Sequence, residues 1–188
     1  MRKIITGLFT IVIIAGMGAF AWKACAADDQ TDQAGEAASG GEAAAGGECC
    51  KADDTTPPTD LVNNTPKGGL HNPYADKVTD AAFAEEGHHT YLSAGCNGCH
   101  GGGGGGGMCP PLTNDTWVYG PDDDTLFRLV TLGSDALKAA GYHRVKQEVV
   151  VGPMPPFGGI LKTSDQLWKI ITFIRSVNPS SVGKPPLQ

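Results

Sequence analysis

The sequence predicts a mainly α-helical domain with long loops. Three segments carry apolar residues at helical spacing behind a capping residue, and no segment shows the sustained alternation of a half-buried strand. Glycine and proline account for 27 and 13 of the 188 residues, which excludes a coiled coil or a regular helical bundle throughout the chain. About a hundred residues remain for a core, which is small and needs additional stabilisation.

The first 26 residues predict export. Arg2 and Lys3 precede an apolar stretch that ends at Trp22, and Ala24-Cys25-Ala26 has the pattern of a signal-peptidase site. The stretch approaches the roughly 20 residues that span a bilayer, so residues 1–26 are a signal peptide or an uncleaved anchor. In both cases the positive pair stays inside and the following chain is carried across, so we expect a periplasmic protein.

The net charge excludes one large class of function. The formal charge is −6, and cleavage after Ala26 removes three positive residues and no acid, which gives −6 − 3 = −9. Proteins that bind nucleic acid present a basic face to the phosphate backbone. We therefore set nucleic acid aside as a partner.

Residues 27–69 predict a low-complexity tether, because they contain almost no large apolar side chain whose burial would offset the entropy lost on ordering. The folded domain is expected over residues 70–180, with residues 181–188 as a C-terminal tail.

Three helices follow in order. The first is capped by Thr79 or Asp80 and runs to about Ser93, and the second is capped by Asp122 and runs to Leu132. The expected buried side of the second consists of Leu126, Phe127, Leu129 and Val130.

The third helix has the clearest signal, because Thr163 and Gln166 have the spacing of a capping box. Its apolar face follows at helical spacing and ends before Pro179: Leu167, Ile170, Ile171 and Ile174. Val149, Val150 and Val151 predict at most a short extended piece.

A single motif indicates the chemistry. Cys96 and Cys99 with His100 form C-x-x-C-H, the attachment signal of a c-type haem, in which two thiols add to the haem vinyl groups and the histidine binds the iron. A redox dithiol does not need the histidine, and a zinc site would need a second pair of ligands at matching spacing. We therefore predict one covalent haem c, which would supply the missing apolar centre of the core.

The histidine needs a hydrogen-bond acceptor that fixes its tautomer and orientation. The turn at Pro110 and Pro111 follows His100 closely, and the Pro110 carbonyl is the predicted acceptor.

The second axial ligand is predicted to be Met154. Three prolines stiffen its loop, whereas Met108 lies in the loop that leaves the His100 side. The alternative for Met154 is a core-filling side chain. The rival ligands are histidines that otherwise suit the surface: His88, His89 and His143. Methionine and histidine together leave no open iron site, which suits electron transfer.

Over about residues 75–178 the chain resembles a class I cytochrome c: it has Gly87-x-x-x-Tyr91, the haem motif, Pro110-x-Leu112, the Met154 loop and a terminal aromatic-aliphatic helix. More narrowly, residues 96–134 and the loop VVVGPMPPFG resemble the cytochrome cL group, the periplasmic partners of PQQ-dependent methanol dehydrogenases, and within it the members that serve lanthanide-dependent enzymes. Cys109 departs from the pattern, because relatives carry a small residue before the proline.

The resemblance implies a monohaem carrier that takes single electrons from a PQQ-dependent methanol or alcohol dehydrogenase and passes them to a downstream cytochrome or oxidase. It also implies that Trp117 and Tyr119 bind a haem propionate, although both suit ordinary burial equally well. A general periplasmic carrier to a terminal oxidase is the alternative, and a haem peroxidase or gas sensor would require Met154 to leave the iron.

Three features have more than one interpretation. A disulfide can join Cys109 to Cys49 or Cys50, or these cysteines stay free or pair between chains. The run Gly101–Gly107 either lets a partner approach the haem edge or is a connector with positive-φ turns. The acids at residues 122–124 either dock a basic partner or favour a helix start, and we prefer the cap.

Overall fold

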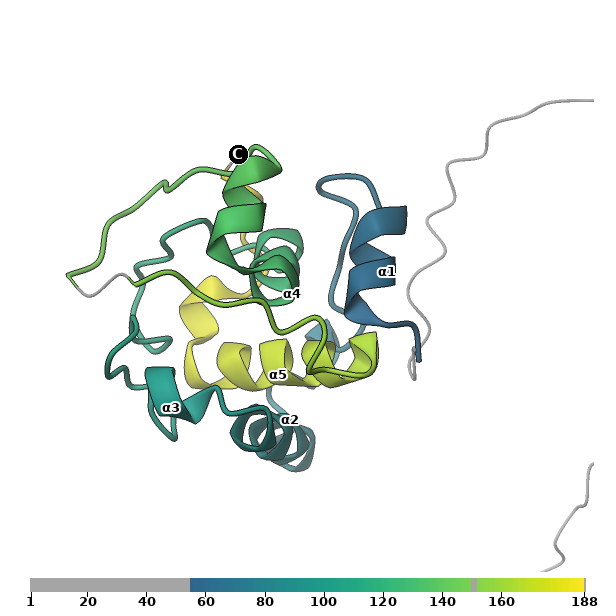
Figure 1. Cartoon of the computed structure of the whole chain (residues 1–188). Coiled ribbons are helices and arrows are strands. Elements are labelled where there is room, and N and C mark those ends of the chain that lie inside the picture. The colour runs from purple at the N-terminus through teal and green to yellow at the C-terminus, as the bar shows by residue number, and fades with distance from the viewer. Residues whose placement is uncertain (1–54, 150–151, 188) are drawn as a thin grey trace, which may run out of the picture. The chain divides into compact units, whose positions relative to one another are not determined.

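Helices joined by long loops make up the described part of the protein, which in this computed structural model comprises residues 55–149 and 152–187 (Figure 1). The α-helices are α1 (Pro58–Asn64), α2 (Ala81–Ser93), α3 (Asn97–His100), α4 (Asp123–Ala139) and α5 (Ser164–Val177). Two short 3₁₀ helices, η1 (Ala75–Lys77) and η2 (Pro179–Ser181), complete the set. No strand occurs among these residues, and the mainly α-helical class with long loops is confirmed.

Helix α5 forms the centre of the core, and its predicted apolar face is confirmed. Leu167, Trp168, Ile170 and Ile171 are each at most 1% exposed. The capping box is present, because Thr163 accepts from the Gln166 amide and the Gln166 side chain accepts from the Thr163 amide. The helix therefore begins where the sequence places it.

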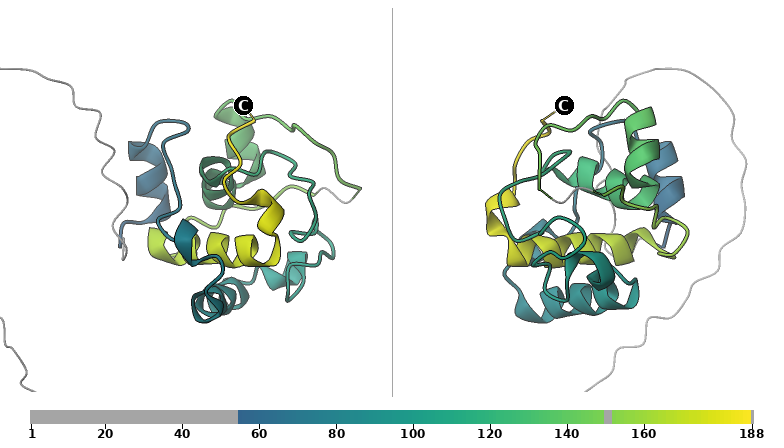
Figure 2. Two further views of the ribbon diagram at one scale, coloured as in Figure 1. Left: turned by 180° about the vertical axis from the view of Figure 1, so that it is seen from behind. Right: turned by 60° about the vertical axis from the view of Figure 1, so that its left-hand side comes forward.

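Helix α2 packs across α5, and both views of Figure 2 draw the two helices side by side. At the crossing, a Cβ atom on Gly87 would lie 2.1 Å from the Lys169 carbonyl oxygen, so no side chain fits there. Tyr91 and Phe173 pack beside it with their ring centroids 5.1 Å apart. Asp80 caps α2, as one of the two predicted alternatives. The glycine thus fixes how closely the two helices approach.

Helix α4 begins as predicted, with the Asp122 carboxylate accepting from the Thr125 amide at 2.9 Å. It extends beyond the predicted end at Leu132, because the chain kinks at Gly133 (φ +75°) and then resumes helical geometry up to Ala139. The predicted helix covers only the first of the two helical pieces that Gly133 joins.

The predicted boundary at residue 70 is too late. Residues 58–64 form α1, and Val62 in it is 6% exposed and belongs to the core. The buried Arg128 guanidinium donates to the carbonyl oxygens of Val62, Thr65 and Pro66 at 3.2, 2.7 and 2.8 Å. Polar contacts of this kind leave no apolar signature in the sequence, and they order a segment that composition alone assigns to the tether.

Of the predictions for the two ends of the chain, only some fall on residues that the structure describes. The signal or anchor segment 1–26, tether residues 27–54, Val150 and Val151 lie outside the described residues. Of the predicted tail, Ser181 is fully buried and closes η2. None of the helices in the described ranges is long and apolar enough to cross a membrane.

Candidate functional site

A cavity opens between α3, α4 and α5, with about 880 Å³ of space not filled by protein atoms, including its open mouth. Its walls are almost entirely apolar. Cys96, His100 and Pro110 line it together with Leu126, Leu129 and Met154. The lining is apolar with a few polar groups, as is typical of cofactor pockets, so the site has the surroundings that a buried porphyrin needs.

The first wall is the short helix α3. A single turn of helix, closed by the bond from the His100 amide to the Cys96 carbonyl at 3.0 Å, brings the C-x-x-C-H residues together at the cavity. Cys96 is 8% exposed, and burial raises the pKa of its thiol to about 11. Two residues of the motif, Cys96 and His100, therefore line one apolar space.

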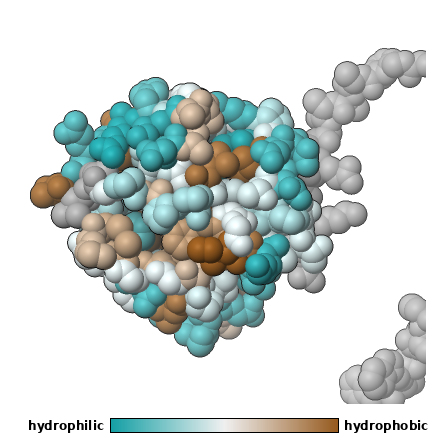
Figure 3. Space-filling view, in the orientation of Figure 1, coloured by the Kyte–Doolittle hydropathy of each residue, from teal (hydrophilic) through white to brown (hydrophobic). Residues whose placement is uncertain are grey.

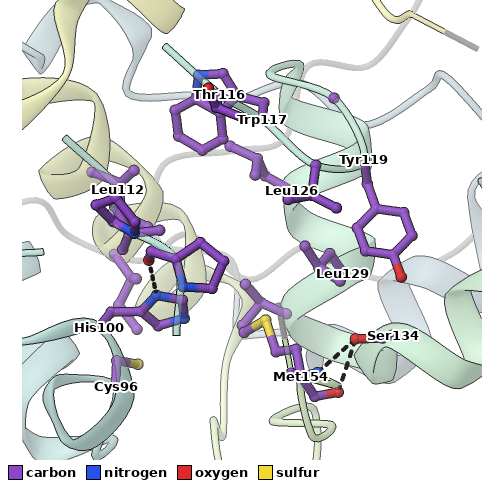
Figure 4. A pocket seen from close by; sticks show the side chains of 18 of the residues that line it. Cys96, His100, Leu112, Thr116, Trp117, Tyr119, Leu126, Leu129, Ser134 and Met154 are labelled. Carbon is purple, nitrogen blue, oxygen red and sulfur yellow. Dashed lines mark hydrogen bonds between the residues drawn. The ribbon is translucent and has the colours of Figure 1, made fainter. Parts of the chain in front are cut away.

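The predicted bond from His100 to Pro110 is present. Nδ1 of His100 lies 2.7 Å from the Pro110 carbonyl oxygen, as Figure 4 shows. A carbonyl oxygen only accepts, so Nδ1 carries the proton and Nε2 is left as the nitrogen for a metal. Cys109 does not disturb this turn, although its side chain is the departure from the family pattern.

Backbone hydrogen bonds order the loop that leads from His100 to Pro110. The Gly106 amide donates to the His100 carbonyl at 2.8 Å, the Cys109 amide to Cys99 at 3.2 Å, and the Leu112 amide to Gly104 at 2.7 Å. These bonds close the loop on itself and place the Pro110 carbonyl beside the histidine.

The glycine run divides into two groups. Gly101, Gly104 and Gly106 have positive φ angles of 78°, 76° and 95°, and a Cβ atom on Gly107 would lie 2.9 Å from the Cys99 carbonyl oxygen. These four positions need glycine for the connector itself. The other three, Gly102, Gly103 and Gly105, have open space at the Cβ position and φ angles outside the left-handed region, so their role is not explained by the loop.

Helix α2 holds the start of this loop. The Tyr91 hydroxyl donates to the Gly101 carbonyl at 2.6 Å, and burial raises its pKa to about 12, so it remains a phenol at neutral pH. One turn earlier, Nε2 of His88 lies 2.7 Å from the Gly102 carbonyl oxygen. The sequence analysis weighed His88 only as a rival ligand or a surface residue, and no local pattern connects it with a loop 14 residues away.

The second wall carries Met154. Its thioether points into the same cavity as the His100 ring, and the two residues come from different walls (Figure 4). The rival ligands do not line the cavity: His89 and His143 are exposed, and His88 is engaged with the loop. Met108 is 71% exposed. The cavity therefore favours Met154 among the predicted candidates.

Two residues beside Met154 were missed by sequence reasoning. Ser134 lines the cavity and bonds to the Met154 backbone, and Gly133 provides the kink that brings it there. An isolated glycine inside a helical pattern is a signal for close packing, and it was available at position 133.

One buried donor tests whether the cavity fits a haem. Within the described part of the chain, the indole N–H of Trp117 is buried and has no hydrogen-bond partner. Trp117 and Tyr119 both line the cavity, and the Arg175 guanidinium carbon lies 5.7 Å from the Trp117 ring. A buried N–H needs an acceptor, and a haem carboxylate would supply one. The residues present thus fit the group, and the propionate role of Trp117 stays a prediction.

The acids at residues 122–124 are used within the fold. Asp122 caps α4, Asp123 pairs with Arg175 at 2.8 Å, and Asp124 pairs with Arg128 at 3.0 Å. The preference for a cap over a docking site is confirmed for Asp122. Cys109 lies beside Cys99, and burial raises the pKa of its thiol to about 11, while Cys49 and Cys50 lie outside the described residues.

The helical fold, the one-turn haem motif and the apolar cavity define a c-type cytochrome domain of class I, which binds haem c covalently. In agreement with this class, residues 82–174 match the family model described as cytochrome C oxidase, cbb3-type, subunit III. Comparisons with curated proteins and with solved structures gave no match. The family match does not extend to the cytochrome cL group.

Proposed function

We propose that the protein is an exported carrier with a single haem, which accepts single electrons from a PQQ-dependent methanol or alcohol dehydrogenase and passes them to a downstream cytochrome or oxidase. The observation that carries the proposal is the pair of potential axial ligands, His100 and Met154, on different walls of one apolar cavity. Two protein ligands leave the iron closed to substrates, as electron transfer requires.

The chain's own residues hold and orient the cofactor. When bound, the haem supplies an iron that gains and loses one electron. Cys96 and Cys99 would supply its thioether bonds, and Pro110 keeps His100 in one tautomer. Met154 would be the second ligand, and Trp117 would donate to a propionate. The apolar lining excludes water and so limits the solvent reorganisation that accompanies each electron transfer.

The dehydrogenase as electron donor rests on the resemblance of residues 96–134 and the Met154 loop to the cytochrome cL group. The test is the reduction of the purified ferric protein by a purified PQQ-dependent methanol dehydrogenase with methanol. We expect steady reduction with two equivalents of protein consumed for each methanol oxidised. No reduction, with a standard cytochrome acceptor reduced in parallel, rejects this donor.

The surface around the haem motif bears on how a partner docks. No Asp, Glu, Lys or Arg occurs between residues 87 and 114, and Met108 in this segment is largely exposed. Figure 3 shows apolar and hydrophilic groups side by side on the face drawn there. A segment without charged side chains makes few ion pairs, so we expect the reduction rate to depend only weakly on salt if the partner docks on residues 87–114.

A general carrier to a terminal oxidase is the second candidate. The match of residues 82–174 to the cbb3-type oxidase subunit model favours it, because the protein with that description belongs to an oxidase. The discriminating experiment is the oxidation of the reduced protein by a purified cbb3-type oxidase. Fast oxidation without reduction by the dehydrogenase favours this candidate.

The peroxidase or sensor alternative predicts an accessible iron. Carbon monoxide added to the reduced native protein decides between the classes. The carrier predicts an unchanged spectrum, because Met154 occupies the second axial position, and a bound carbon monoxide band contradicts it.

A further inference from the structure

The Met154 loop packs against the kink in α4. A Cβ atom on Gly133 would lie 2.8 Å from both the Met154 carbonyl oxygen and the Pro156 nitrogen, so the loop backbone passes directly over the glycine. Beyond Met154, the amides of Phe157 and Gly158 donate to the carbonyls of Val130 and Thr131 at 2.9 and 3.1 Å. The kink exposes these carbonyls, and the loop satisfies them.

Three prolines leave this loop with very few backbone hydrogen-bond donors. Pro153, Pro155 and Pro156 have no backbone N–H, so Met154 carries the only backbone donor between residues 153 and 156. That donor is given to the hydroxyl oxygen of Ser134 at 2.6 Å. A single side chain therefore accepts the one amide hydrogen bond that this stretch can make.

Ser134 forms hydrogen bonds with both the amide and the carbonyl group of Met154. Its own amide donates to the Met154 carbonyl at 2.9 Å, and its hydroxyl lies 3.5 Å from the same oxygen. Ser134 is 3% exposed, so water does not compete for these bonds. Figure 4 draws the contacts between the Ser134 hydroxyl and the Met154 backbone, on the side of Met154 that faces away from the His100 ring.

We propose that Ser134 is a positioning residue for the sixth haem ligand: its hydroxyl anchors the one free amide of the Pro153–Pro156 loop and thereby keeps the Met154 sulfur at the iron. The inference rests on the proposed function, because it takes Met154 as the ligand. Its consequence is that the hydroxyl governs how easily the methionine is displaced, while the fold itself depends on it little.

The test is a titration of the ferric holoprotein with imidazole, which competes with Met154 for the iron. An entering ligand binds only the fraction of molecules whose methionine has left, so a weaker anchor raises its apparent affinity. In Ser134→Ala the amide bond from residue 134 remains and the hydroxyl bond is lost. We expect the apparent imidazole affinity to rise roughly fivefold, the effect of about one hydrogen bond.

Thr131→Val is the matched control. This side chain is equally buried on the same helix, and its hydroxyl bonds only to the Phe127 carbonyl within α4. We expect this variant to bind imidazole as the unsubstituted protein does. A second measurement needs no substitution: the Met154 amide of the reduced protein should be protected from hydrogen exchange. Free exchange of this amide contradicts the anchor.

The outcomes separate the two levels of the proposal. The ferric protein should show the weak charge-transfer absorption of a methionine–iron bond. If this band is missing from the unsubstituted protein, Met154 is not the ligand, and both the proposed ligation and the proposed role of Ser134 are wrong. If the band is present and Ser134→Ala matches Thr131→Val in imidazole affinity, the anchor alone is wrong and the carrier function stands.

Discussion

The carboxylate of Asp124 joins three separate parts of the chain through hydrogen bonds. Its carboxylate accepts from the Leu70 amide at 3.1 Å, from Arg128 at 3.0 Å and from the Tyr142 hydroxyl at 2.7 Å. Burial would raise the pKa of Asp124, but these donors and the Gly68 amide outweigh it and hold the pKa below its usual value. The charged form is therefore part of the folded structure.

We predict that Asp124→Asn lowers the free energy of unfolding by about 3 kcal/mol at neutral pH, since it leaves the buried Arg128 uncompensated. Because the folded pKa is depressed, the stabilisation is complete above the unfolded value of about 3.9 and is lost as the pH falls toward the folded value. Denaturant unfolding between pH 7 and pH 2 should show the two proteins converging below about pH 4.

Asp135→Asn is the control for this prediction, because Asp135 pairs with Lys138 at 2.9 Å on the exposed surface. We expect a change of less than about 1 kcal/mol. An equal loss in both variants would show that burial of the Asp124 pair contributes nothing.

His88 gives the second prediction at this scale. Its ring stacks on Phe173 at 4.6 Å while Nε2 donates to Gly102, so His88→Phe keeps the stacking and removes the donor. We expect the Gly106 amide in the same loop to exchange with solvent several-fold faster, because an anchor worth about 1 kcal/mol is lost. Hydrogen exchange of the reduced holoprotein measures this.

His89→Phe supplies the comparison. Both histidines lie 3.6 Å from Glu85, but the His89 side chain is 78% exposed. Faster loop exchange in both variants would mean that charge near Glu85, rather than the bond to Gly102, orders the loop.

At the level of elements, the glycine loop and the kinked helix α4 show how backbone geometry serves the site. In both, a positive φ angle lets two backbone segments approach where a side chain would separate them. The loop brings Pro110 back to His100, and the kink brings Ser134 to Met154. The two proposed axial ligands are thus held by backbone groups as much as by side chains.

The two groups of loop glycines predict opposite results. Gly106→Ala places a Cβ atom 3.2 Å from Pro111 at φ +95°, and we expect a loss of about 1–2 kcal/mol in the free energy of unfolding. Gly103→Ala with Gly105→Ala has open space and should be neutral or stabilising by less than about 1 kcal/mol. Thermal unfolding of the holoprotein distinguishes the two cases.

The same double variant also tests what the unexplained glycines do. If they let a partner approach, electron transfer from the partner slows although stability is kept. An unchanged rate favours the connector for the whole run.

For the whole molecule, the cavity explains how so small a domain holds together. The apolar side chains of α4 and α5 face a space that the chain does not fill, and burial of apolar surface is the main source of stability in folding. Without the haem, the same side chains face a void or water. The cofactor is therefore a structural part of the core.

We predict that Cys96→Ser with Cys99→Ser, which prevents covalent attachment, gives a protein without a cooperative thermal transition, because the empty cavity removes packing from all core helices. Near-ultraviolet circular dichroism and calorimetry measure the loss. As a control, Cys109→Ser leaves the attachment residues intact and should unfold cooperatively. A cooperative transition in the double variant contradicts the structural role of the haem.

Much of the fold could be predicted because it follows from short-range spacing. Asp80, Asp122 and Thr163 begin their helices as expected, and the C-x-x-C-H turn needs only one turn of helix. The hydrogen bond from His100 to Pro110 could also be predicted, since only a short loop separates the two residues.

The contacts that could not be predicted join residues distant in the sequence. Ser134 meets Met154, His88 meets Gly102, and Arg128 reaches back to Val62, each through a polar bond without an apolar period. The sequence by itself determined where helices start and which residues form the haem-attachment motif, because capping and spacing act between near neighbours. How the proposed ligands are held depends on helices packing around one cavity, which brings distant backbone groups within hydrogen-bond distance.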